Sequence, residues 1–231
     1  MNVRSLPPVD DEPESESPRE RRARADAELL DRLRREPVQG AAVLYARFSE
    51  TVNRLVWRLL GADAEHHDIV QQVFLKIIQH TDALREPDKL SSWVQAITVN
   101  TVYEELRKRE VRRLFLRESP PPDIYPTLVY DVEVRDFLLR AKAVLDKLPA
   151  KERIVFSLHV LEARTLHEIA ELCGYSLATA KRRLAAANKR FSSLIAKNPD
   201  LARLYEQTRP PASRVQAIDD GEPPLANREE A

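Results

Sequence analysis

Glycine is scarce in this sequence, with only 4 among 231 residues. Each glycine stands alone, so neither a G-x-G-x-x-G dinucleotide-binding turn nor a G-x-x-x-x-G-K-[ST] phosphate-binding loop can be written anywhere. Cysteine is scarcer still, because Cys173 alone permits no internal disulfide and no cysteine-based zinc site. These absences exclude enzymes built on nucleotide-binding loops and disulfide-stabilised secreted domains, and they fit a reducing cytosolic setting.

Long apolar runs are also missing. The longest uncharged stretch, residues 90–103, contains Gln, Asn, Ser and Thr and falls short of the roughly 18–20 apolar residues that a membrane span needs. Residues 1–8 lead directly into acidic residues without the hydrophobic core of a signal peptide. We therefore expect no membrane insertion and a cytoplasmic location.

The charges balance but are unevenly spread. The 37 basic and 37 acidic residues give a net charge of zero, which would argue against a nucleic-acid ligand if the charge were uniform. However, residues 1–20 are predominantly acidic, residues 118–133 carry only acids, and residues 176–197 carry only cations. The neutral total therefore does not exclude DNA binding.

Composition and periodicity predict an all-α protein of two small helical domains. Aromatic residues make up 6% of the chain, and Leu, Ala, Arg and Glu are abundant, which favours helices over a β-sandwich. Helical spacing of apolar residues stops at a run of three prolines, Pro120 to Pro122, which cannot be helix interior. The expected parts are a disordered acidic arm (1–21), a first helical domain (22–117), a Pro-rich acidic linker (118–133), a smaller helical domain (134–198) and a mostly disordered tail (199–231).

The smaller domain contains the pattern of a helix-turn-helix. Thr165 and Glu168 form a capping box that opens a short helix, and Gly174 can supply the left-handed turn that follows. The next helix carries polar and basic residues near its start, where a recognition helix enters a major groove. Its candidate DNA-binding residues are Ser176, Ala178, Thr179, Lys181, Arg182 and Arg183. The competing interpretation is a solvated basic helix in a plain helical bundle.

Two stretches of the first domain look ordinary when each is taken alone. Residues 68–75 form an amphipathic pattern with Asp68, Gln71 and Gln72 on its polar positions. Residues 92–109 join a tryptophan to a polar and then a basic helix. By default Trp93 is a core residue and Asn100 a surface residue.

Together with the helix-turn-helix, these stretches resemble the extracytoplasmic-function group of sigma-70 family RNA polymerase sigma factors. Residues 68–75 are similar to its D-[LI]-V-Q-[ED]-V-F-L helix, although the family commonly has Glu where Gln72 stands. Residues 93–100 are similar to its W-[LV]-x-x-I-[AT]-x-N pattern, and residues 148–156 to its L-P-x-x-x-R-x-V-F pattern. The resemblance covers about residues 41–113 and 131–194 in the family's order.

The resemblance implies two promoter-reading domains that act on core RNA polymerase, without catalysis and without a cofactor or metal. It implies that core polymerase docks on Asp68, Gln71, Gln72 and Phe74. It implies that Asn100 captures a base of the melted minus-10 element, and that the strand backbone is held by Arg107, Lys108, Arg109, Arg112 and Arg113. The helix from Ser176 would read the minus-35 element, the linker would thread the polymerase channel, and an anti-sigma factor is an expected partner.

Three other interpretations remain. A stand-alone helix-turn-helix transcriptional regulator explains residues 165–190 but gives no reason for the arrangement of Trp93, Asn100 and Arg109. A helical adaptor without a DNA role explains the neutral charge but not the acid-free recognition helix. An enzyme is the least favoured, because H-E-x-x-H and G-x-S-x-G motifs are absent and adjacent His66 and His67 cannot face one metal ion from a helix.

Overall fold

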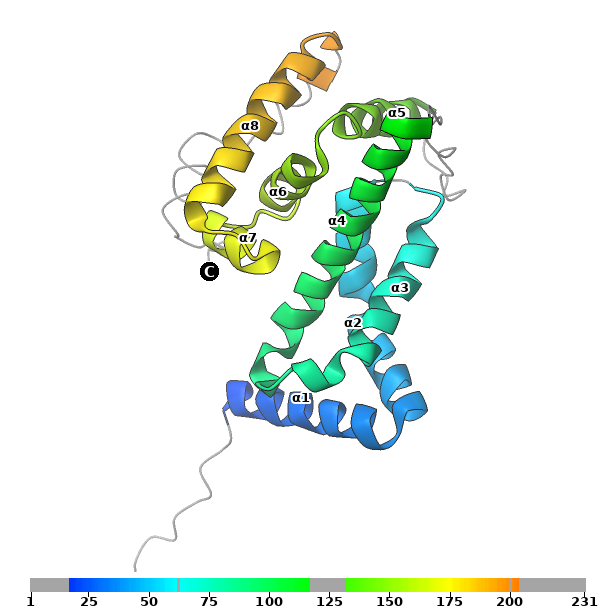
Figure 1. Ribbon diagram of the computed structural model, residues 1–231, viewed down its shortest axis with the longest axis vertical. Helices are drawn as coiled ribbons and strands as arrows, with labels where there is room; N and C mark the ends of the chain where they lie inside the picture. The colour runs from blue at the N-terminus through cyan, green and yellow to red at the C-terminus, as the bar shows by residue number, and fades with distance from the viewer. Residues whose placement is uncertain (1–16, 62, 117–131, 200, 204–231) are drawn as a thin grey trace, which may run out of the picture.

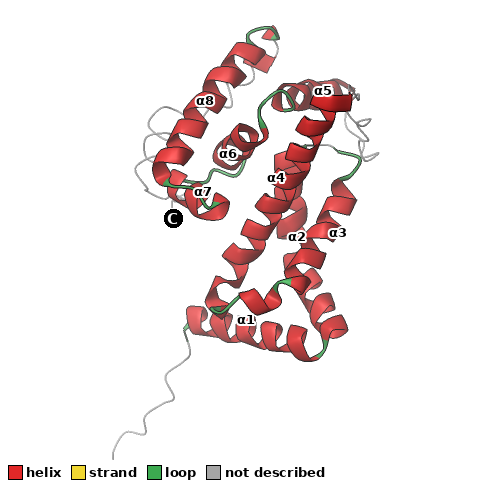
Figure 2. Ribbon diagram, viewed as in Figure 1, coloured by secondary structure: helices red, strands yellow, loops and turns green. Residues whose placement is uncertain are grey.

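The computed structural model of the chain describes residues 17–61, 63–116, 132–199 and 201–203, and all regular structure within these ranges is helical (Figure 2). The all-α prediction is therefore confirmed. In chain order the elements are α1 (Pro18–Arg35), α2 (Pro37–Leu60), α3 (His66–Gln79), the 3-10 turns η1 (Thr81–Ala83) and η2 (Pro87–Lys89), α4 (Leu90–Leu116), α5 (Val132–Leu145), α6 (Ala150–Val160), α7 (Leu166–Cys173) and α8 (Leu177–Ile195). None of these described helices is long and apolar enough to cross a membrane.

The first helix begins earlier than the sequence predicted. Ser17 caps α1 by accepting a hydrogen bond from the backbone of Glu20, whose carboxylate accepts one in return from the backbone of Ser17. Residues 18–21 are thus helical rather than part of a disordered arm, because Glu20 is a capping residue and not only an acid in an acidic run. α5 begins at Val132, two residues before the predicted start of the smaller domain, and residues 201–203 at the start of the predicted tail are helical. Most of the predicted arm, linker and tail lies outside the described residues.

Helices α1 to α4 form a bundle, which we call the first module (Figure 1). α1 crosses the end of the bundle and packs closely on α2 at Gly40, where a Cβ atom would lie 2.6 Å from the Cα of Leu33. α2 and α4 run through the centre and bury Leu44, Val56 and Val94 completely. This packing places one face of α3 and one face of α4 at the surface.

Helices α5 to α8 form the second module. Phe156 of α6 packs against Phe191 of α8 with ring centroids 4.5 Å apart. Leu145 of α5 packs against the same apolar cluster. α7 and α8 are joined by a tight turn at Gly174, which adopts the left-handed conformation at φ 64°.

The two modules pack against one another. In Figure 1, α6 and α7 lie beside α4 along much of its length. Ile154 and Leu158 of α6 belong to the same buried apolar cluster as Leu59 of α2 and Val94 of α4. The sequence predicted two helical domains joined by a linker, and the structure adds that they share a core.

Candidate nucleic-acid interface

The helix-turn-helix is built by local hydrogen bonds. The Thr165 hydroxyl accepts from the backbone N–H of Glu168 at 3.2 Å, and the Glu168 carboxylate accepts from the backbone N–H of Thr165 at 2.8 Å. Burial opposes ionisation of Glu168, but the hydrogen bonds from Thr165 and Arg164 outweigh it, so the pKa of this carboxyl lies below its ordinary value. Ser176 caps α8 by accepting from the backbone N–H of Thr179 at 3.2 Å. The capping box of Thr165 and Glu168 that the sequence predicted is confirmed.

The start of α8 presents a basic surface. Ala178, Lys181 and Arg182 are exposed, while Thr179 is half-buried. Arg183 is also half-buried and lies over the ring of Tyr175, with its guanidinium carbon 4.8 Å from the ring centroid. The exposed cations can contact phosphates or base edges directly. Arg183 is held against the protein and is less available than Arg182.

Cys173 lies at the end of α7 beside this surface. Burial raises the pKa of its thiol to about 12, so the side chain stays protonated at neutral pH. Cys173 is half-buried and packs against the apolar core, whereas the sequence predicted a buried residue.

The face of α4 carries the residues predicted for the minus-10 element. Asn100, Arg107 and Lys108 are exposed, and Arg107 has no ion-pair partner among the described residues. Trp93 is half-buried and packs against the core of the first module. It also lines a cleft of about 380 Å³ between α4 and α7, whose other walls include Gln95 and Arg164. An aromatic ring beside amide and charged groups can hold a planar ligand such as a nucleobase.

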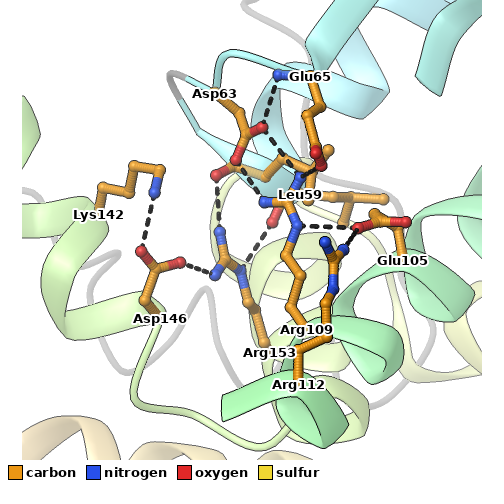
Figure 3. Close-up of polar contacts among 10 residues, drawn as sticks. Leu59, Asp63, Glu65, Glu105, Arg109, Arg112, Lys142, Asp146 and Arg153 are labelled. Atoms are coloured by element: carbon orange, nitrogen blue, oxygen red, sulfur yellow. Dashed lines mark hydrogen bonds and ion pairs between the residues drawn. The ribbon is translucent and has the colours of Figure 1, made fainter. Parts of the chain in front are cut away.

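Arg109, predicted to contact the DNA backbone, is instead committed to internal carboxylates (Figure 3). Its guanidinium donates to Asp63 at 2.5 and 3.0 Å, to Glu65 at 2.5 Å and to Glu105 at 3.0 Å. Its side chain is 11% exposed, and that of Asp63 is 1% exposed. In this arrangement Arg109 joins the start of α3 to α4 and is not presented to a nucleic-acid strand.

The pKa values in this cluster follow from mutual pairing. Burial opposes the charge on Arg109, but the three carboxylates outweigh it and raise the pKa of the guanidinium. Burial likewise opposes ionisation of Asp63, but Arg109 outweighs it and lowers the pKa of the carboxyl. Arg109 and Asp63 are therefore both charged at neutral pH. Glu105 lies four residues before Arg109 and is the one partner that helical spacing alone could have indicated.

The remaining predicted cations of α4 are also engaged to different degrees. Arg112 donates to Glu105 at 2.8 Å, and Arg113 donates to the backbone carbonyl of Asp146 in the second module at 2.8 Å. Lys108 lies 3.8 Å from Glu105 but its side chain is 62% exposed. The structure thus leaves Arg107 and Lys108 as the most accessible cations of the predicted set.

On α3, a polar row with one apolar residue faces outward. Asp68, Gln71 and Gln72 are exposed, and Leu75, at the next position on the same face, is 57% exposed. Phe74, predicted to bind polymerase, is 7% exposed and packs against Tyr45 of α2 with ring centroids 4.9 Å apart. Tyr45 itself is 50% exposed.

Sequence reasoning missed Tyr45 and Leu75 as members of this surface, although the i, i+3, i+4, i+7 spacing from Asp68 places Leu75 in the exposed row. Exposed apolar residues beside polar ones are typical of a protein-docking surface.

His66 at the start of α3 is a packed residue. Its Nε2 lies 3.1 Å from the amide oxygen of Asn53, and its ring meets Trp57 edge-on with centroids 6.0 Å apart. Burial lowers the pKa of the imidazole. Within the described residues no group of acidic, histidine or cysteine side chains is placed to hold a metal ion.

Comparison with known families matches both modules. Residues 44–112 match the family described as sigma-70 region 2, and residues 138–191 match that described as sigma-70, region 4. RNA polymerase sigma factor SigV of Bacillus subtilis is 30% identical over 146 residues, which cover 59% of this chain and 79% of SigV. ECF RNA polymerase sigma factor SigE of Mycolicibacterium smegmatis is 26% identical over 162 residues, which cover 67% of this chain and 61% of SigE.

Solved structures share the fold. The structure of CnrH in complex with the cytosolic domain of CnrY matches with a TM-score of 0.53 at 18% identity, over 77% of this chain and 98% of that one. The sigma factor RpoE of Bartonella quintana, in a co-crystal structure with the anti-sigma factor NepR, matches with a TM-score of 0.50 at 22% identity, over 68% of this chain and 97% of that one.

Proposed function

The chain belongs to the sigma-70 family of RNA polymerase sigma factors, in its extracytoplasmic-function group, and from this premise we propose that it binds core RNA polymerase and directs initiation at specific promoters. The observation that carries the proposal is the pairing of two distinct nucleic-acid surfaces in one chain. One is the acid-free start of α8, and the other is the exposed Asn100 and Arg107 face of α4. The chain supplies binding surfaces in the cytoplasm, and polymerase forms the RNA bonds.

α8 is the reader of duplex DNA in this proposal. Its first two turns expose Lys181 and Arg182 at the N-terminal end, which is the end that enters a major groove. Arg182 can reach a guanine edge with its two-pronged guanidinium, whereas Lys181 acts as a point charge on a phosphate. Arg182→Ala should therefore change the preferred minus-35 sequence, and Lys181→Ala should weaken binding to all sequences similarly.

The face of α4 is the reader of the melted strand. Asn100 offers an amide that can pair with the edge of an extruded base, and Arg107 and Lys108 follow it by two turns of helix. The cleft beside Trp93 gives a flat wall on which a base can stack. Arg109, Arg112 and Arg113 have internal partners and support this face rather than contact the strand.

α3 is the polymerase-docking surface of the proposal. The exposed row of Asp68, Gln71, Gln72 and Leu75 supplies polar contacts and one apolar anchor. Phe74 is buried and packs against the half-exposed ring of Tyr45, so its role is to hold that ring in place at the surface. Leu75→Ala should weaken polymerase binding, because it removes the largest exposed apolar group of the row without touching the core.

Transcription in vitro tests the proposal. Purified protein added to core polymerase should permit initiation from a cognate promoter, and Asn100→Ala should impair promoter melting while leaving polymerase binding unchanged. Glu104→Ala, one turn further along α4, is the matched control and should leave melting intact. Tight binding to duplex DNA without polymerase, together with failure to co-purify with polymerase, would instead identify a stand-alone regulator.

An anti-sigma factor is a further proposed partner. The Bartonella quintana relative was crystallised with one, and this chain shares that fold. Purification of the native protein from cells with its bound partners tests the proposal, since an anti-sigma factor should co-purify and block initiation when added back.

A further inference from the structure

The start of α1 carries a group of positive charges without partners. The first seven residues of α1 contain four arginines and one acid, and the carboxylate of that acid, Glu20, accepts a hydrogen bond from the backbone N–H of Ser17 at 2.8 Å. Arg19, Arg21 and Arg22 are exposed and form no ion pair with any residue that the structure describes. α1 precedes the residues that match sigma-70 region 2, and the proposed function gives these arginines no role.

The stability of α1 does not account for these arginines. The amino-terminal end of a helix is the positive pole of its dipole, so cations placed there destabilise the helix. In the last turn of α1 the dipole favours cations, and Arg35 there also pairs with Asp31 at 3.1 Å. The arginines at the start have neither advantage. Exposed, unpaired cations at this end of a helix favour an anionic ligand from outside the chain.

Arg19 and Arg22 lie on the side of α1 that packs on the bundle. Arg22 is four residues before Asp26 and seven before Leu29, and Arg19 is seven before Asp26. Because Asp26 and Leu29 are buried, helical spacing places both arginines on the buried face of α1, beyond the point where the core ends. Figure 1 shows this end of α1 (dark blue) next to the start of α4, and α1 contacts η2, which directly precedes α4.

A groove of about 510 Å³ lies between the start of α1 and η2. It is lined by Ser17, Arg19, Glu20, Ala23, Pro87 and Asp88. Glu20 is already paired with the backbone of Ser17, so Asp88 is the acid of this lining that would repel an anion. α4 begins at Leu90, directly after η2. The groove therefore lies at the start of the helix that is proposed to hold the melted strand.

The proposed path of the melted strand leads toward this groove. The end of α4 that carries Arg107 is followed in the chain by the second module, which is the proposed reader of the upstream element. The start of α4 is therefore the downstream end. Asn100 lies ten residues after Leu90, which is about 15 Å of helix. That distance corresponds to about four nucleotides of a stacked strand at about 3.4 Å per nucleotide.

We propose that Arg19 and Arg22, at the groove between α1 and η2, bind phosphates of the melted promoter strand downstream of the base held at Asn100. Arginine suits this role because its guanidinium is always charged and presents several donors to phosphate oxygens. Contacts to the strand backbone hold the strand in position and add no sequence preference. The inference rests on the proposed function, because it requires a strand that is melted on α4.

Forked promoter DNA of two lengths tests the contact in the complex of the full chain with core polymerase. In the short probe the single strand ends at the base held at Asn100. In the long probe it continues about eight nucleotides further downstream, which exceeds the about four nucleotides needed to reach the start of α4. Fluorescence anisotropy measures both affinities, and the unmodified complex should bind the long probe more tightly.

Arg19→Ala combined with Arg22→Ala should weaken binding of the long probe on the order of ten-fold and leave the short probe unchanged. The slope of log affinity against log salt for the long probe should fall by about 1.4, the value for two single-strand phosphates. Arg19→Lys with Arg22→Lys keeps both charges and should keep most of the slope. Asp88→Asn should have the opposite effect and tighten binding of the long probe alone, because it removes the negative charge from the groove.

Arg32→Ala with Arg35→Ala is the matched control, because it removes the same charge from exposed positions of the same helix. These positions are thirteen residues further along α1, about 20 Å away, which exceeds the screening length of about 8 Å at physiological salt. The control should leave the affinity for both probes unchanged. In thermal denaturation the Arg19 and Arg22 double alanine variant should melt slightly above the unmodified protein, since it removes cations from the positive end of α1.

Each alternative result has a separate meaning. Equal affinity of the unmodified complex for the two probes would overturn the inference and leave the proposed function standing. An unchanged salt slope in the double alanine variant, as expected if the acids of residues 10–16 occupy the arginines, would also overturn it. So would an equal loss of affinity for both probes, which indicates a general effect of charge. Failure of the unmodified protein to bind either probe with polymerase would refute the proposed function itself.

Discussion

Replacement of Arg109 by alanine is expected to reduce the free energy of unfolding by about 3 kcal/mol. The substitution leaves the carboxylates of Asp63 and Glu105, which are nearly fully buried, without their main partner. Loss of one member of a buried ion pair costs roughly 3–5 kcal/mol, and the lower end applies because Glu65 is partly exposed and water can reach the site. Urea denaturation followed by circular dichroism measures the change. Arg107→Ala, two residues earlier and exposed, is the control and should cost less than about 0.5 kcal/mol.

The pH dependence of that deficit tests its electrostatic origin. In the intact protein the pKa of Asp63 is lowered, so the pair contributes stability above the ordinary aspartate pKa and loses it as the pH falls through the lower folded value. In Arg109→Ala, burial without the partner raises the pKa of Asp63 instead. The folded variant then takes up a proton more readily than its unfolded form, so the deficit should shrink as the pH falls from 7 toward 5.

Salt dependence separates a structural role from DNA contact. For the polymerase complex on promoter DNA, Arg107→Ala should reduce the slope of log affinity against log salt by about 0.7, the value for one single-strand phosphate. Arg109→Ala should leave that slope unchanged. The reasoning would be refuted if the Arg109 variant were as stable as the Arg107 control. It would also be refuted if the Arg109 variant reduced the slope of log affinity against log salt by about 0.7, the value for one phosphate contact.

Three further changes have defined outcomes. Gly40→Ala should lower stability by about 1–3 kcal/mol in thermal denaturation, because the new Cβ meets the backbone of Leu33, and an unchanged melting temperature would contradict the close α1–α2 packing. Thr165→Ala should lower the free energy of unfolding by about 1 kcal/mol, because it removes the hydroxyl that accepts the hydrogen bond from the Glu168 backbone N–H at the start of α7. Thr165→Ser keeps a hydroxyl there and should retain most of that stability. Cys173, with a thiol pKa of about 12, should react with iodoacetamide at pH 8 on the order of 10³-fold more slowly in the folded than in the unfolded protein; equal rates would show that the thiol is not buried.

Short-range sequence patterns were enough to predict the helix-turn-helix. The capping box of Thr165 and Glu168, the turn at Gly174 and the cap at Ser176 all join residues three or four positions apart, so their spacing in the sequence already determines the geometry. The same local logic was available at Ser17 and Glu20, but the surrounding acids and prolines concealed it, and the start of α1 was predicted too late.

Roles that depend on distant partners could not be predicted in this way. The family resemblance grouped Arg109 with the other cations of α4 as strand contacts, but the structure places its side chain among internal carboxylates. Asp63 is 46 residues away from Arg109, and nothing in the spacing shows that the loop after α2 returns to α4. The same resemblance predicted Phe74 to be a docking residue, whereas tertiary packing buries it against Tyr45.

The sequence by itself determined that the chain is helical, where its helix-turn-helix lies and to which family it belongs, because periodicity, caps and motif order are properties of neighbouring residues. Only the tertiary structure decided which cations are free to meet DNA and whether the two modules lie apart or together. The contact of Arg153 with the end of α2 joins residues 94 positions apart, and burial there depends on how whole helices pack. Such packing follows from the sum of many weak contacts across the chain, which no short motif records.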